Sequence, residues 1–121
     1  MKRVLVVDTT IKTGQSTLIL QGQNFEVQSF PSFRCMMTPA VNHRPDIVIC
    51  VIRGEPMERA MIEHLKSYPV TKDIPVLALL DVNVESQASQ YISLVDDALP
   101  LTVDDRELVK KVQTLLGEEL E

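Results

Sequence analysis

Three short aliphatic runs, separated by longer mixed segments, constrain the fold of this chain more than any other feature. The runs span residues 4–7, 47–52 and 76–80, and none of them alternates between apolar and polar side chains. A strand that is exposed on one face shows such alternation, whereas a strand buried on both faces is a continuous apolar run. The three runs therefore predict central strands of a parallel sheet that is covered by helices on both faces.

Weaker strand patterns and helical patterns fill the intervals between these runs. Residues 25–30 and 98–99 are the weaker strand candidates, and residues 9–22 form a weak first helix. Three apolar stripes at helical spacing comprise Phe33, Met36, Met37, Ala40 and Val41; Ala60, Met61, His64 and Leu65; and Leu108, Val109, Val112, Leu115 and Leu116. Strand and helix thus alternate five times, which predicts a single α/β domain over residues 1–121.

The last helix carries its own boundary signals. Thr102 and Asp105 have the spacing of a capping box, and Gly117 follows the last apolar residue of the stripe. These residues predict a capping box at the start of the helix, whose exact first residue stays open, and a stop at the glycine.

Composition and charge argue against several classes of protein. The chain has 17 acidic and 12 basic residues, a formal charge of −5 and no basic stripe, which argues against nucleic-acid binding. No apolar run approaches the roughly 20 residues of a membrane span, and the run after Arg3 is too short for a signal peptide. We therefore expect a cytoplasmic protein with reduced thiols. Cys35 and Cys50 show no metal-binding spacing, and we expect Cys50 to pack in the core.

Six segments of the chain, in order, resemble the strands and the last helix of response-regulator receiver domains, the phosphoacceptor modules of two-component signalling. The segments are RVLVVD, NFEV, RPDIVICVI, KDIPVLALL, DDAL and ELVKKVQTLL. The resemblance covers nearly the whole chain. It implies a flavodoxin-like, doubly wound sheet of five parallel strands in the order 2-1-3-4-5, with ligands bound at the carboxyl ends of the strands.

The chemistry of that family needs five side chains at this end of the sheet. Two acids after the first strand and an aspartate ending the third hold Mg²⁺, and that aspartate accepts the phosphoryl group. A Thr or Ser after the fourth strand and a Lys after the fifth contact the phosphoryl oxygens. The resemblance carries these positions onto Asp8, Thr9, Val51, Leu80 and Leu101, in that order. Only Asp8 keeps the family's chemistry.

The replacements change the character of the site. Val51, Leu80 and Leu101 are all aliphatic, and the fold implied by the resemblance brings them together at one end of the sheet. Ala98 occupies the position of the aromatic residue that moves on activation, and Asp46 belongs to the opposite end of the third strand. We interpret the chain as a pseudo-receiver that has lost phosphorelay chemistry, with no catalytic residues, no metal and no cofactor.

Three hypotheses remain for the surviving Asp8: a residual metal ligand, a helix cap, or a partner for a cation. We favour a structural role, because a single carboxylate is a poor Mg²⁺ site. We also hypothesise that Arg53 supplies Asp8 with a permanent positive charge in place of the metal. Asp81 either competes for this arginine or caps the following helix, and we slightly favour the cap.

The stretch from residue 84 to residue 116 corresponds to the surface through which receivers meet partners or dimerise. Side chains expected to project from it are Gln87, Gln90, Tyr91, Asp104, Arg106, Lys110 and Lys111. Tyr91 is the preferred anchor, because exposed tyrosines are enriched at binding hot spots. An ordinary solvated face is an equally good interpretation of the charged members.

The sequence therefore predicts a non-catalytic interaction module of a bacterial signalling protein, which binds an unknown protein partner or a second copy of itself. Two alternatives stay open. One is a working phosphoacceptor receiver, and the other is a small-ligand sensor or minor enzyme on the same fold, which would need a polar cleft at the strand ends. The acidic tail, residues 118–121, is also compatible with a helix that runs on into an output domain.

Overall fold

The structure is a computed structural model of the 121-residue chain, and it describes residues 3–7, 25–30, 44–54, 56–100 and 104–117. The elements in chain order are β1 (Arg3–Val7), β2 (Glu26–Phe30), β3 (Ile47–Ile52), α3 (Pro56–Ser67), β4 (Val76–Leu80), the 3₁₀ helix η2 (Val82–Gln87), α4 (Ala88–Ile92), β5 (Asp97–Pro100) and α5 (Asp105–Leu115). All five predicted strands are present, whereas the predicted helices over residues 9–22 and 33–41 lie outside the described residues.

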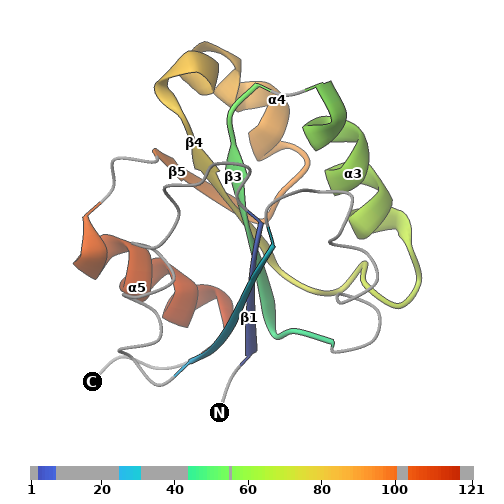
Figure 1. Cartoon of the computed structure of the whole chain (residues 1–121), viewed down its shortest axis with the longest axis vertical. Coiled ribbons are helices and arrows are strands. Elements are labelled where there is room, and N and C mark those ends of the chain that lie inside the picture. The colour runs from blue at the N-terminus through green and yellow to red at the C-terminus, as the bar shows by residue number, and fades with distance from the viewer. Residues whose placement is uncertain (1–2, 8–24, 31–43, 55, 101–103, 118–121) are drawn as a thin grey trace.

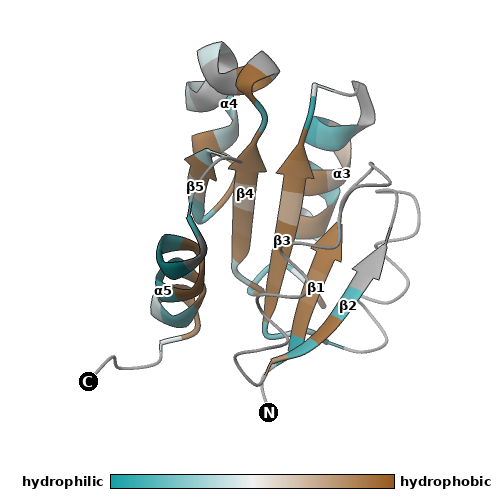
Figure 2. Ribbon diagram, turned by 60° about the vertical axis from the view of Figure 1, so that its left-hand side comes forward, coloured by the Kyte–Doolittle hydropathy of each residue, from teal (hydrophilic) through white to brown (hydrophobic). Residues whose placement is uncertain are grey.

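The five strands form one sheet in the order β2-β1-β3-β4-β5, and every neighbouring pair is parallel. The predicted fold class and strand order are therefore confirmed. β3 and β4 lie inside the sheet and every one of their residues is buried, which explains their unbroken apolar sequence (Figure 2).

Two hydrophobic cores lie on opposite faces of the sheet. One core joins alternate residues of β1, β3 and β4 to Ile62 and Leu65 of α3 and to Tyr91 of α4. The other joins the remaining strand residues to Leu108 and Val112 of α5. Figure 1 shows α5 on one side of the sheet and α3 on the other. Because successive side chains of a strand point to opposite faces of the sheet, the same strands contribute residues to both cores.

Capping residues at both ends determine where α5 begins and ends. Asp104 is the N-cap, and its carboxylate accepts a hydrogen bond from the N–H of Glu107 at 2.9 Å. Gly117 follows the C-cap with a φ of 75°, a conformation that glycine adopts without steric cost. The predicted stop is confirmed. The capping residue at the start is Asp104, whereas Thr102, the cap of the predicted capping box, lies outside the described residues.

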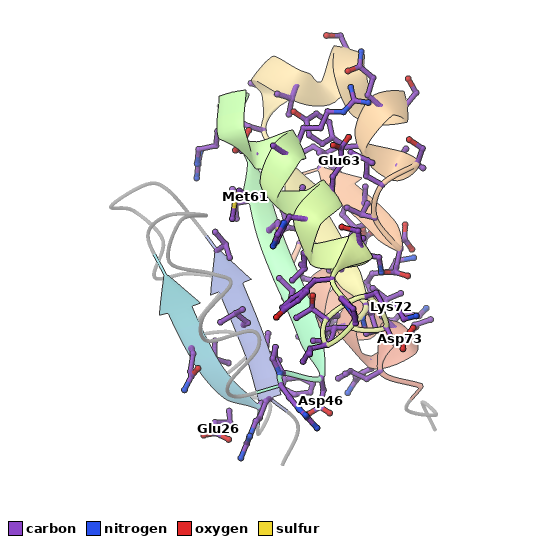
Figure 3. All side chains as sticks on the ribbon, turned by 90° about the vertical axis from the view of Figure 1, so that its right-hand side faces the viewer. Glu26, Asp46, Met61, Glu63, Lys72 and Asp73 are labelled. Carbon is purple, nitrogen blue, oxygen red and sulfur yellow. The ribbon has the colours of Figure 1, made fainter. Side chains whose placement is uncertain are left out.

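The buried stripe of α3 differs from the predicted one. Ala60 and His64 are exposed, whereas Glu58, Ile62 and Leu65 are completely buried. Figure 3 shows Met61 projecting toward the side of β1, and Glu63 projecting on the other side of the helix. The buried face is displaced from the predicted one because its helical spacing runs from the buried Glu58 through Ile62 to Leu65.

Among the described residues, no helix combines the length and the apolar character that crossing a membrane requires.

Candidate functional site

The candidate site lies at the carboxyl ends of β3 and β4, beneath the start of α3 and η2 (Figure 2). Val51, which the resemblance aligns with the phosphoacceptor position, is completely buried, and Leu80, which it aligns with the Thr or Ser position, is 5% exposed. Asp8, Thr9 and Leu101 lie outside the described residues, so their expected roles stay predictions.

Val51 and Leu80 lie at the same, carboxyl end of the sheet, as expected, but their side chains enter different hydrophobic clusters. In the β3–β4 register Val51 faces Leu79, and Leu80 faces Ile52. Val51 therefore belongs to the core beneath α5, and Leu80 belongs to the core beneath α3 and α4. The two side chains separate because residues one step apart in register point to opposite faces of a sheet.

An ion pair spans the two loops above these strand ends. The Nη1 atom of Arg53 lies 2.9 Å from Oδ2 of Asp81, and the two side chains are 22% and 19% exposed. Asp81 therefore pairs with Arg53, which is the alternative to the helix cap that we slightly favoured, while competition with Asp8 stays a prediction. The N–H of Val84, in the first turn of η2, bonds to the carbonyl oxygen of Asp81. The hypothesis that Arg53 also serves Asp8 stays a prediction.

A buried carboxylate that sequence reasoning missed organises the loop after β3. Glu58 is completely buried, and its two oxygens accept hydrogen bonds from the N–H groups of Arg53 at 2.7 Å and Gly54 at 2.8 Å. A charged group is buried at tolerable cost only where such bonds replace water. The sequence did contain a signal for this contact. Proline is common at the first position of a helix, and Glu58 is then at the third position, from which a glutamate can accept hydrogen bonds from N–H groups that precede the helix.

The charge of Glu58 acts on two neighbours in the same core. Burial raises the pKa of the Cys50 thiol to about 12, and the Glu58 carboxylate adds to this shift. Burial and Glu58 also raise the pKa of Tyr91, against an opposing effect of Arg59. The predicted burial of Cys50 is confirmed, and its raised pKa keeps the thiol protonated.

The opposite end of the sheet is occupied by structural contacts. Asp46 accepts a hydrogen bond from the N–H of Arg3 at 2.7 Å, and its own N–H donates to the carbonyl of Arg3. Asp46 and Glu26 lie together at the amino ends of the strands in Figure 3. Asp46 is therefore remote from the candidate site, as predicted.

The expected interaction face is only partly exposed. Gln90, Arg106 and Lys110 are exposed, and the side chain of Gln87 lies outside the described residues. Tyr91 is 6% exposed and packs in the core with Val84 and Val95. Its choice as an exposed anchor was wrong, because the short α4 turns this ring toward the sheet.

Two further members of that face make intramolecular contacts. Asp104 caps α5, and Lys111 is half-buried and forms an ion pair with Asp97 at 2.7 Å. Among the described residues, no group of three or more His, Cys, Asp or Glu side chains is placed to hold a metal ion.

Comparison with known proteins gives matches at the level of structure. No protein-family model matches the sequence, and neither does any curated protein. A response regulator from Desulfuromonas acetoxidans superposes with a TM-score of 0.85 at 21% identity, over 97% of this chain and 98% of that one. The signal receiver domain of a histidine kinase from Syntrophus aciditrophicus has the same score and identity, over 97% and 91% of the two chains.

A third similar structure contains a metal. It is the receiver domain of a sensor histidine kinase from Pseudomonas aeruginosa, with a magnesium ion coordinated in its active site cleft. It superposes with a TM-score of 0.85 at 15% identity, over 97% of this chain and 98% of that one. With its five parallel strands in the order 2-1-3-4-5, this chain has the flavodoxin-like fold of response-regulator receiver domains.

Proposed function

We propose that residues 1–121 form one receiver-type signalling domain that takes up no phosphate and acts by binding another protein or a second copy of itself. The observation that carries this proposal is the environment of Val51, at the end of β3. Its side chain has no oxygen and is completely buried, while its neighbours on the same face are apolar. A phosphoryl acceptor needs an accessible nucleophilic oxygen, and valine supplies none.

The described strand ends do not fit a magnesium ion. Mg²⁺ requires oxygen ligands in near-octahedral geometry, but Val51 and Leu80 offer only hydrocarbon there. The nearest described carboxylate beyond β4 is that of Asp81, which is engaged by Arg53. We therefore do not extend the magnesium site of the Pseudomonas structure to this domain, and we propose neither a cofactor nor an enzymatic activity.

The proposal places the domain in the cytoplasm, where receiver-type modules meet their signalling partners. Gln90 of α4 and the pair Arg106 and Lys110 of α5 are exposed and remain candidates for contact with a partner. Arg106 and Lys110 are spaced four residues apart and therefore lie on one side of α5. The exposed acids Asp104 and Glu107 lie beside this pair, so the start of α5 carries both signs of charge and, in a chain of net charge −5, favours a protein surface over nucleic acid.

Treatment with acetyl phosphate and Mg²⁺ tests the proposal directly. The expected result is an unchanged intact mass, together with unchanged amide chemical shifts after addition of beryllofluoride and Mg²⁺. A receiver that has the full set of acids, Thr and Lys serves as the positive control under the same conditions. Gain of one phosphoryl group by this chain would overturn the proposal and establish the phosphoacceptor alternative.

A further inference from the structure

Two loops at the candidate site are joined by a shielded ion pair. Arg53 lies in the loop after β3, and Asp81 lies in the turn that leads from β4 into η2. Their charged atoms are 2.9 Å apart, and about four fifths of each side chain is covered. An ion pair that is partly withdrawn from water attracts more strongly than one on the surface, because the local dielectric constant is lower.

Asp81 joins three elements through three different groups. Its carboxylate binds Arg53, its N–H donates to the carbonyl oxygen of Ile52 at 2.9 Å, and its carbonyl oxygen accepts from the N–H of Val84 at 2.9 Å. The bond to Ile52 extends the contact between β3 and β4 by one residue. The bond from Val84 forms part of the first turn of η2, so movement of Asp81 also moves η2.

Two hydrogen bonds hold the backbone of Arg53 and Gly54 in the loop after β3. Both oxygens of Glu58 bind N–H groups of this loop, and they anchor it to the first turn of α3. Gly54 has a φ of 95°, and a Cβ atom at this position would lie only 3.3 Å from Cγ1 of Val84. The loop after β3 and the first turns of η2 therefore pack closely as well as sharing an ion pair.

We propose that the Arg53–Asp81 pair is a latch that holds η2 against β3, in one position, without phosphate or metal. The latched segment carries the exposed side chain of Val82, which is 72% exposed, and it continues directly into α4. The role of the latch rests on the proposed function. A domain that receives no phosphate would need another means of holding this segment in one position, and the ion pair provides it. The physical claim about the two loops is independent of that function.

Amide hydrogen exchange in the full chain tests the latch. R53M removes the guanidinium but keeps an apolar stem, and D81N removes the charge at nearly constant shape. We expect either substitution to accelerate exchange of the Val84 N–H roughly tenfold, the loss expected for one charged hydrogen bond, while β1 amides remain protected. The control is R59M, which removes the exposed Arg59–Glu63 pair of α3 and should leave Val84 unchanged.

The double variant R53M/D81N distinguishes a pair from two unrelated residues. A latch predicts that the second substitution adds little to the first, since both remove the same interaction. Unchanged exchange at Val84 in both single variants would overturn the inference, and so would equal acceleration across all strands. Phosphoryl uptake is read by mass and the latch is read by exchange, so the proposed function and the latch fail independently.

Discussion

Lys111 of α5 reaches Asp97 at the start of β5, with 2.7 Å between Nζ and Oδ2. Burial on its own raises the pKa of Asp97, but the hydrogen bond from Lys111, the N–H of Ala98 and the charge of Lys111 lower it overall. The last helix is thereby fixed to the edge strand by a contact that requires an ionised carboxylate.

Replacement of Lys111 by Met should weaken the fold by about 0.5–1 kcal/mol near neutral pH, the range for a solvent-screened ion pair. The pKa of Asp97 is lower in the folded state than in the unfolded state. The stabilisation is therefore present above the unfolded value and is lost as the pH falls through the folded value. Denaturant unfolding at about pH 7 and at a pH below the folded pKa of Asp97 measures this loss. A difference between K111M and wild type that persisted at the acidic pH would contradict the assignment.

The thiol of Cys50 should resist alkylation in the folded chain. With its pKa raised from 9.0 to about 12, almost no thiolate forms near neutral pH, and the side chain is completely buried. We expect iodoacetamide to modify Cys50 at least about a hundredfold more slowly than in the denatured chain. Peptide mapping separates Cys50 from Cys35, and rapid modification of native Cys50 would contradict its burial.

The same shift has an opposite pH dependence from that of Asp97. Above its ordinary pKa of 9.0 the thiol ionises in the unfolded chain but stays protonated in the folded chain until about 12. The free energy of unfolding should therefore fall as the pH rises through this interval, by up to about 1.4 kcal/mol per pH unit from this group. A C50A variant lacks this contribution, so its stability should decline less steeply than that of wild type.

Tyr91 should behave as a core residue. Y91A removes a ring that packs with Val84 and Val95, and we expect a loss of about 3–5 kcal/mol in the free energy of unfolding. The exposed neighbour provides the matched control, because Q90A should change stability by no more than about 0.5 kcal/mol. Chemical denaturation of both variants provides the measurement. A Y91A variant as stable as Q90A would show that the ring is not buried.

An aspartate introduced at position 51 should damage the fold and, under the proposed function, should accept no phosphoryl group. V51D places a carboxylate among apolar side chains of the core beneath α5, where nothing described replaces its water. We expect a loss of at least about 3 kcal/mol, measured by thermal or denaturant unfolding. V51T, of similar shape, is the milder control. Phosphoryl uptake by a folded V51D variant would show that the site is still functional.

Much of the fold is determined by local sequence. The boundaries of β3 and β4 follow from their unbroken aliphatic runs, since only interior parallel strands need apolar residues on both faces. The end of α5 follows from Gly117, because glycine adopts a positive φ readily. Both signals are local, and therefore both can be recognised in the sequence without knowledge of the tertiary structure.

The buried face of α3 and the environment of Tyr91 required the tertiary structure. Glu58 is buried because two N–H groups of the preceding loop donate hydrogen bonds to its carboxylate. The hydropathy of the side chains cannot predict these backbone contacts. Tyr91 is hidden because the short α4 packs close to β4 and β5. Burial of an amphipathic or charged side chain depends on partners brought from elsewhere.

The candidate site divides in the same way. Sequence alone determined that hydrocarbon stands at positions 51 and 80, because residue identity along a strand needs no coordinates. Only the tertiary structure decided that these two side chains enter different cores, and that Arg53 meets Asp81 across 28 residues of chain. The register of the strands and the contact between the two loops depend on how whole elements pack, and a local sequence pattern does not predict that packing.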